Sequence, residues 1–279
     1  MRYQRVSNEA ELTAALSDPA AAILSGGTDL LVRIRGGLAS PDLLIDISGV
    51  PTLHGLRRTD SAIEIGAAVP ENEILASPAV RNALPLLATA LRTLGSIQIR
   101  NRGTLGGNLV NASPAADSAI PLLLYDAELD LVSSEGQRTV AVDGFFLGPG
   151  RAALRPGEFV RTVRIPIPEA EYQGFYHKVG KRRALTIAIA SLGALIRVDK
   201  GLMAEARFAA GSVAPTPVRL RAVEDRLQGS PLTEDLIEEA RCLAMDGISP
   251  ISDIRATAEY RFEVIGDLVA RALRDGLHD

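Results

Sequence analysis

The apolar positions in the first half of the chain fall into short runs that alternate with helical patterns. Asn8 and Glu11 match a capping box, which predicts a helix through Leu16. A second helix is predicted over residues 78–94, in which Pro85 can introduce a kink, because leucines recur at helical spacing at Leu84, Leu87, Leu91 and Leu94. Short apolar or alternating runs predict strands at residues 21–24, 43–47, 62–65, 127–133 and 160–165.

A second region follows Pro166-Ile167-Pro168, where we expect a domain boundary because two prolines interrupt the pattern. Beyond it the apolar positions predict strands at residues 191–198 and 204–210, and helices at residues 233–244 and 254–273. The pattern therefore predicts an α+β protein with two domains, residues 1–168 and 169–279.

Composition removes several classes of function. A chain of 279 residues with 47% hydrophobic and 23% charged residues is typical of a globular protein of about two domains. The net charge of -4 argues against nucleic-acid binding. No apolar run reaches membrane-spanning length, and Met1–Arg5 leads into no apolar segment, so we expect no signal peptide. We therefore expect a cytoplasmic protein without membrane insertion.

Cysteine and histidine usage excludes further chemistries. The one thiol, Cys242, cannot by itself ligate an iron–sulfur cluster, and its helical context predicts a buried structural residue. The three histidines are scattered without zinc-site spacing. The sequence contains neither a nucleophile elbow nor a Walker A motif. We expect no metal site and no catalytic side chain in this chain.

The chemistry is concentrated in two glycine-bearing stretches. Adjacent glycines let the backbone approach a ligand closely, and consecutive amides in a turn can bind an anion. Two such turns could hold the two phosphates of a dinucleotide, although neither has the Rossmann spacing before a helix. The stretches are Ile23-Leu24-Ser25-Gly26-Gly27-Thr28-Asp29-Leu30 and Thr104-Leu105-Gly106-Gly107-Asn108.

Two carboxylates accompany these turns. Asp117 follows the second turn and is suited to accept hydrogen bonds from the hydroxyls of a ribose or ribityl chain. Asp29 is expected to accept from backbone or sugar hydroxyls, since a bare carboxylate would repel phosphate. The hydroxyl of Thr28 can donate to a phosphate oxygen.

With these motifs the chain resembles the FAD-binding medium subunits of molybdenum-containing hydroxylases, the group of xanthine dehydrogenase, carbon monoxide dehydrogenase and 4-hydroxybenzoyl-CoA reductase. The resemblance covers nearly the whole chain in the same order. It lies in SGGTDL at residues 25–30, QIRNRGTLGGNL at 98–109, NASPAAD at 111–117, KRRALTIA at 181–188 and DIRATAEYR at 253–261.

The resemblance implies a fold and a cofactor site. It implies an FAD-binding domain of vanillyl-alcohol-oxidase type, with subdomains of about residues 1–55 and 56–168, and then the C-terminal domain of carbon monoxide dehydrogenase flavoproteins. Residues 23–30 and 104–108 would hold the FAD pyrophosphate, and Asp117 a sugar or ribityl hydroxyl. Lys178 and Ile187 match positions near the flavin. Leu94 falls where some relatives place a phenylalanine, and for Leu94 and Ile187 ordinary core packing is the alternative.

The resemblance also implies partners and a task. A large subunit would oxidise the substrate at a molybdopterin centre, and a small subunit would carry electrons through two [2Fe-2S] clusters to the FAD of this chain. The flavin would then reduce NAD or another acceptor. The expected assembly is a heterotrimer or a dimer of heterotrimers.

Two other classes of protein remain as alternatives. One is a self-contained flavin oxidase or dehydrogenase of the same fold, which would need a catalytic base that this histidine-poor chain does not display. The other is an interaction protein that kept the fold and lost the cofactor. The intact glycine turns and Asp117 argue against the second alternative.

Overall fold

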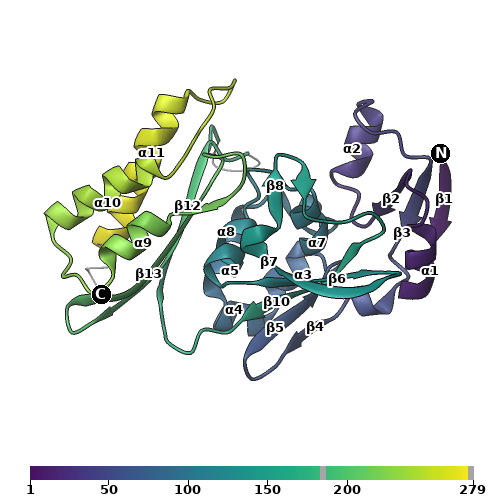
Figure 1. The fold of residues 1–279 in the computed structure, drawn as a ribbon, viewed down its shortest axis with the longest axis horizontal. Coiled ribbons are helices and arrows are strands. Elements are labelled where there is room, and N and C mark those ends of the chain that lie inside the picture. The colour runs from purple at the N-terminus through teal and green to yellow at the C-terminus, as the bar shows by residue number, and fades with distance from the viewer. Residues whose placement is uncertain (183–186, 276–279) are drawn as a thin grey trace. The chain divides into compact units, whose positions relative to one another are not determined.

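The computed structural model describes residues 1–182 and 187–275 (Figure 1). They form two compact units, and the chain enters unit 2 for the last time at Pro168. Unit 1 comprises Met1–Ala83, Ser96–Ala112 and Asp126–Ile167, and unit 2 comprises Leu84–Gly95, Ser113–Tyr125 and Pro168–Asp279.

A three-stranded parallel sheet carries the first elements of unit 1. The side-chain oxygen of Asn8 accepts a hydrogen bond from the amide of Glu11 (2.9 Å), and the Glu11 carboxylate accepts one from the amide of Ser7 (2.7 Å). This confirms the predicted helix start. Leu12 of the helix and Ile45 of the sheet are both fully buried in one apolar cluster. The sheet has the order β1-β3-β2, with β1 at Arg2–Arg5, α1 at Glu9–Ala15, β2 at Ala21–Leu24, α2 at Leu30–Arg35 and β3 at Leu43–Asp46.

A five-stranded antiparallel sheet of order β4-β5-β10-β6-β7 forms the second part of unit 1. Ile63 and Ile65, two positions apart on β5, are both fully buried, as period-two alternation predicts. The strands predicted at 62–65, 127–133 and 160–165 are confirmed. The strands are β4 (Leu56–Arg58), β5 (Ala62–Gly66), β6 (Glu128–Ser133), β7 (Gly136–Ala141) and β10 (Phe159–Pro166).

Short elements connect these sheets. They are η1 (Pro51–Leu53), α3 (Glu71–Ala76), α4 (Pro78–Ala83), α6 (Ile97–Arg100), α7 (Leu105–Val110), η2 (Val142–Gly144), β8 (Phe146–Gly148) and β9 (Arg151–Ala152).

The prediction of one continuous helix over residues 78–94 is wrong. It is two helices, α4 in unit 1 and α5 (Pro85–Thr93) in unit 2. Leu84 between them has φ −132° and ψ 56°, outside the helical region. Proline disfavours helical geometry in the residue before it and supplies no amide hydrogen, so Pro85 ends one helix and begins the next.

Unit 2 contains a four-stranded antiparallel sheet of order β11-β12-β13-β14, with helices packed on both faces (Figure 1). Leu192, Ala194 and Ile196 alternate along β12 and pack in the cluster shared with α9, α10 and α11. On the other face, a Cβ atom at Gly193 would lie 2.6 Å from Ile120 of α8, so this glycine lets α8 pack closely. The elements are α8 (Ala119–Leu124), β11 (Gln173–Val179), β12 (Ala190–Asp199), β13 (Leu202–Gly211), β14 (Val218–Arg219), α9 (Arg221–Leu227), α10 (Glu234–Asp246) and α11 (Ala258–Asp275).

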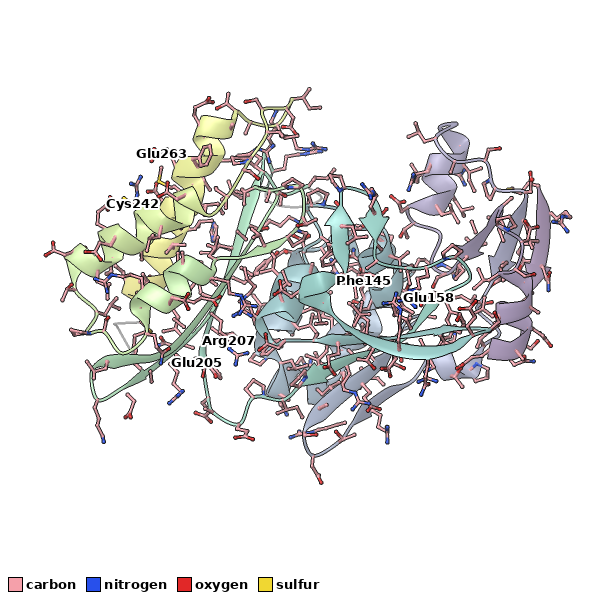
Figure 2. The ribbon with its side chains drawn as sticks, viewed as in Figure 1. Phe145, Glu158, Glu205, Arg207, Cys242 and Glu263 are labelled. Carbon is pink, nitrogen blue, oxygen red and sulfur yellow. The ribbon has the colours of Figure 1, made fainter. Side chains whose placement is uncertain are left out.

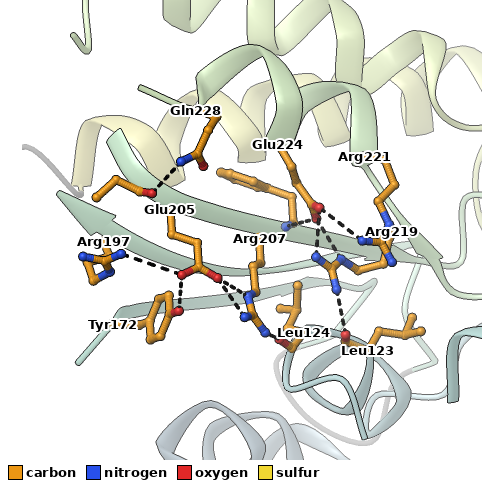
Figure 3. A network of polar contacts seen from close by, with 12 residues as sticks. Leu123, Leu124, Tyr172, Arg197, Glu205, Arg207, Arg219, Arg221, Glu224 and Gln228 are labelled. Atoms are coloured by element: carbon orange, nitrogen blue, oxygen red, sulfur yellow. Dashed lines mark hydrogen bonds and ion pairs between the residues drawn. The ribbon is translucent and has the colours of Figure 1, made fainter. Parts of the chain in front are cut away.

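Two arginines join the end of α8 to this sheet (Figure 3). Arg219 donates to the carbonyl oxygen of Leu123 (2.9 Å) and forms two hydrogen bonds of 2.8 Å with the Glu224 carboxylate. Arg207 donates to the carbonyl oxygen of Leu124 (2.8 Å). The last carbonyls of a helix lack partners within it, and these guanidinium groups supply them.

Two sequence expectations for unit 2 are corrected. Cys242 is exposed on α10 and not buried, because the buried face of that helix carries Leu236, Ile237, Ala240 and Ala244 (Figure 2). Helix α11 begins at Ala258 instead of residue 254, because residues 253–256 form a separate turn. Among the described residues no helix is long and apolar enough to cross a membrane.

Candidate functional site

The two glycine turns, far apart in sequence, touch in unit 1. A Cβ atom at Gly26 would lie 1.8 Å from the carbonyl oxygen of Arg102, so only a residue without a side chain permits this approach. The hydroxyl oxygens of Ser25 and Thr104 lie 3.1 Å apart, within hydrogen-bond distance. The fold therefore brings the two predicted stretches together.

The first turn presents open backbone donors. Gly27 has φ +74°, a conformation that residues with a side chain rarely adopt. In the part of the chain that the structure describes, the amides of Gly26, Gly27 and Thr28 donate no hydrogen bond. Consecutive amides of this kind form a concave site for an anion.

Thr104 fixes the start of α7 beside that turn. Its hydroxyl accepts a hydrogen bond from the amide of Gly107 (3.2 Å), and its carbonyl oxygen accepts one from the amide of Asn108 (2.9 Å). The Thr104 side chain is buried. Thr104 and the amides of Gly107 and Asn108 were predicted to contact phosphate. All three groups already have a hydrogen-bond partner within the chain.

The two glycines of the second turn differ in their surroundings. A Cβ atom at Gly106 would lie 2.5 Å from the Cβ of Ala67, and the amide of Gly106 donates to the carbonyl oxygen of Ala67 (3.0 Å). Gly106 thus permits close packing of α7. Gly107 is exposed, and a Cβ atom there would meet only the Thr104 hydroxyl, at 2.9 Å. Its backbone is therefore exposed.

The remaining predicted residues of unit 1 surround these turns. Asp29 is exposed, and its Oδ2 lies 4.0 Å from Nη1 of Arg33, four residues further along the chain. Leu105 is fully buried, and its amide donates to the carbonyl oxygen of Val69 (3.3 Å). Three apolar members of the predicted set are partly buried on either side of the first turn: Ile23, Leu24 and Leu30.

In unit 2, Asp117 and Lys178 form a buried ion pair. Lys178 Nζ lies 2.6 Å from Asp117 Oδ2, and both side chains are 6% exposed. Lys178 also donates to the carbonyl oxygen of Thr93 (3.1 Å), and the Tyr176 hydroxyl donates to Asp117 Oδ1 (3.0 Å). Burial raises the pKa of Asp117, against the opposing effects of Lys178 and Tyr176. Burial and the Asp117 charge raise the pKa of Tyr176 well above its usual value, so its hydroxyl stays protonated.

Sequence reasoning found Asp117 and Lys178 but missed Tyr176. The available signal was spacing, because Tyr176 and Lys178 are two positions apart on β11 and so share one face of the strand. The other two candidates of unit 2 differ in exposure. Leu94 is 7% exposed, which fits the alternative of core packing, whereas the Ile187 side chain is 56% exposed and does not.

The chain matches two known sequence families in succession. Residues 1–168 match the FAD binding domain in molybdopterin dehydrogenase, and residues 175–275 match the CO dehydrogenase flavoprotein C-terminal domain. Together with the fold, these matches define a flavoprotein subunit of a multi-subunit oxidoreductase.

Individual relatives agree with that class. The chain is 34% identical over 253 residues to the carbon monoxide dehydrogenase medium chain of Hydrogenophaga pseudoflava, covering 91% of this chain and 88% of the relative. It is 32% identical over 278 residues to a putative xanthine dehydrogenase FAD-binding subunit of Escherichia coli, covering 99% of this chain and 95% of the relative. A solved structure of carbon monoxide dehydrogenase from Hydrogenophaga pseudoflava matches with a TM-score of 0.95 at 33% identity, covering 98% of this chain and 96% of that chain.

The chain therefore belongs to the family of FAD-binding medium subunits of molybdenum hydroxylases. The predicted family, the α+β fold class and the assignment as an oxidoreductase subunit are confirmed.

Proposed function

We propose that this chain passes electrons between the [2Fe-2S] clusters of a small partner subunit and NAD or another acceptor, while a large molybdopterin subunit oxidises the substrate. The observation that carries the proposal is the contact between the two glycine turns, at which Gly26 meets the carbonyl group of Arg102. The relatives named above as a medium chain and as an FAD-binding subunit support the division of labour among subunits.

In unit 1, the first turn is the better donor to a diphosphate. The amides of Gly26, Gly27 and Thr28 have no acceptor among the described residues, and burying such donors without a partner is unfavourable. The Thr28 hydroxyl adds a further donor. In the second turn, Gly107 leaves its backbone uncovered for a ligand, while Thr104 and Gly106 hold α7 in place. These features fit the diphosphate of FAD.

In unit 2, we propose that Asp117, Lys178 and Ile187 contact the cofactor. An ionised carboxylate has about four acceptor positions, and Asp117 uses two of them for Lys178 and Tyr176. The remaining positions suit ribityl or ribose hydroxyls. The exposed side chain of Ile187 offers an apolar surface for the flavin ring.

When bound, FAD supplies redox chemistry that links one-electron iron–sulfur donors with a two-electron acceptor. The chain's own residues bind and orient it. The lone Cys242 is consistent with clusters that are ligated in another subunit.

Gly107→Asp tests the site directly. The substitution adds a negative charge at the uncovered backbone, and we expect the purified chain to lose bound flavin, measured by its visible absorption after reconstitution with FAD. The control is Gly144→Asp, which adds the same charge at an exposed glycine with nothing within 4 Å of its Cβ position. Normal flavin content in Gly107→Asp would show that the turn does not face the cofactor.

Copurification separates the proposal from a self-contained flavin oxidase. We expect tagged protein from its native cell to bring down two further subunits, together with molybdenum and iron in metal analysis. A monomer that binds flavin and oxidises a substrate alone would favour the self-contained enzyme.

A further inference from the structure

Asp117 is held at both of its carboxylate oxygens. Lys178 Nζ donates to Oδ2 (2.6 Å), and the Tyr176 hydroxyl donates to Oδ1 (3.0 Å). Lys178 is held in turn by the carbonyl oxygen of Thr93, to which it donates (3.1 Å). The last bond of an aspartate side chain has a broad torsional preference, so a partner at each oxygen fixes the plane of the carboxylate. The proposed function gives Lys178 a role but gives none to Tyr176.

Tyr176 and Lys178 reach this carboxylate from one face of β11. They are two positions apart on the strand, so both side chains stand on the same side of the sheet. Their cross-strand partners on β12 are Gly193 and Ser191, which are both small. A Cβ atom at Gly193 would lie 3.8 Å from Cδ2 of the Tyr176 ring, so the ring lies directly beside this glycine. The small residues of β12 leave room for the two long side chains of β11.

The same face of the sheet supports helix α8, which begins two residues after Asp117. A Cβ atom would lie 2.6 Å from the Ile120 side chain at Gly193 and 3.1 Å from it at Gly211. The Tyr176 ring and α8 therefore pack against the same point of β12. This packing places the Tyr176 hydroxyl at the start of α8, where it meets the Asp117 carboxylate.

We infer that Tyr176 is a positioning residue that orients the Asp117 carboxylate toward a hydroxyl group of bound FAD. The inference rests on the proposed function, in which Asp117 accepts hydrogen bonds from ribityl or ribose hydroxyls. Tyr176 acts through Asp117 and not by touching the cofactor. Without its hydrogen bond the carboxylate can turn about its last bond, and its orientation must then be fixed when FAD binds. Ordering on binding weakens affinity, and preorganisation avoids that cost.

The main test is Tyr176→Phe in the complete chain, which removes the hydroxyl and keeps the ring beside Gly193. We expect FAD to bind about fivefold more weakly in a titration, because the carboxylate must then be oriented on binding. A second measurement follows the Asp117 carboxyl group by NMR in the isotopically labelled chain without FAD. It should take up its proton at a higher pH than in the wild type, because the Tyr176 hydrogen bond acts to lower the pKa of Asp117.

Tyr125→Phe is the matched control for a loss of stability alone. Tyr125 directly follows α8, at the opposite end of the helix from Asp117, and is buried. Its hydroxyl accepts a hydrogen bond from the amide of Leu86 (3.3 Å). We expect Tyr125→Phe to lower the melting temperature while FAD affinity and the titration of Asp117 stay at wild-type values. Equal loss of FAD affinity in Tyr125→Phe would overturn the inference, because general destabilisation would then be sufficient.

A cycle of variants tests whether Tyr176 acts through Asp117. In Asp117→Ala/Lys178→Met no carboxylate remains for Tyr176 to orient, so adding Tyr176→Phe should weaken FAD binding no further. An undiminished loss of affinity in that background would overturn the inference, since Tyr176 would then act without Asp117. Wild-type FAD affinity in Tyr176→Phe alone would also overturn it. Failure of the wild-type chain to bind FAD would instead refute the proposed function, and the NMR titration would still test whether Tyr176 holds the Asp117 carboxylate.

Discussion

At Gly26 two distant parts of the chain come closer than any side chain would allow. The carbonyl oxygen of Arg102 occupies the position that a Cβ atom would need. The glycine is therefore required for the contact between the two turns.

Gly26→Ala should separate the two turns. We expect a loss of about 1–3 kcal/mol in the free energy of unfolding, the usual cost of overpacking, together with loss of flavin. Urea denaturation and flavin absorption measure the two effects. Gly55→Ala is the control, since Gly55 has nothing within 4 Å of its Cβ position and should lose neither stability nor flavin.

Asp117 has a structural partner as well as a proposed ligand. Asp117→Ala leaves the buried Lys178 ammonium without its carboxylate, and breaking a buried pair costs about 3–5 kcal/mol of unfolding free energy. The double variant Asp117→Ala/Lys178→Met should recover part of that stability. Both variants should bind FAD more weakly, by about 1.5–3 kcal/mol for the lost charge-assisted hydrogen bond. Wild-type FAD affinity in the double variant, measured by titration, would remove Asp117 from the site.

At the scale of elements, two threonine caps have the same geometry but different surroundings. Thr104 caps α7 and Thr233 caps α10, each accepting from an amide three residues on at 3.2 Å. Only Thr104 also contacts Ser25 of the first glycine turn. The pair thus separates the effect of a cap on stability from its effect on the site.

Thr104→Ala and Thr233→Ala should each lower the free energy of unfolding by about 1 kcal/mol, the usual value of an N-cap. Only Thr104→Ala should also reduce flavin retention, because it loosens α7 beside the first turn. Denaturation curves and flavin content measure the two quantities. An equal loss of flavin in Thr233→Ala would mean that the Thr104 effect is one of stability alone.

For the whole molecule, the proposed task is relay and not substrate oxidation. In the complex assembled with Gly107→Asp, dithionite should still reduce the iron–sulfur clusters. The complex should not pass electrons to NAD or oxygen through this chain. Bleaching of the cluster absorption reports cluster reduction, and reduction of NAD or oxygen reports electron transfer to the acceptor. The measurement with NAD is made without oxygen. Wild-type rates of acceptor reduction in a flavin-free complex would show that the electrons leave by another route.

The sequence predicted secondary structure correctly where an element is stabilised by residues close to it in the chain. The Asn8 cap, the strand at residues 21–24 and the helix predicted over residues 233–244 all depend on neighbours within a few positions. Two predictions were wrong. In one, the leucine spacing continued across a proline that ends the helix, and in the other, the sequence did not show which face of a helix is buried. Pro85 ended a helix despite regular leucine spacing, and Cys242 fell on the exposed face of its helix.

By itself, the sequence determined the family, the α+β class and the two glycine stretches, because glycine pairs and capping patterns act through the backbone nearby. Only the tertiary structure decided that Gly26 touches Arg102 and that Asp117 pairs with Lys178 and Tyr176. These contacts join residues tens of positions apart. Their geometry follows from how sheets and helices pack, which no local pattern of residues specifies.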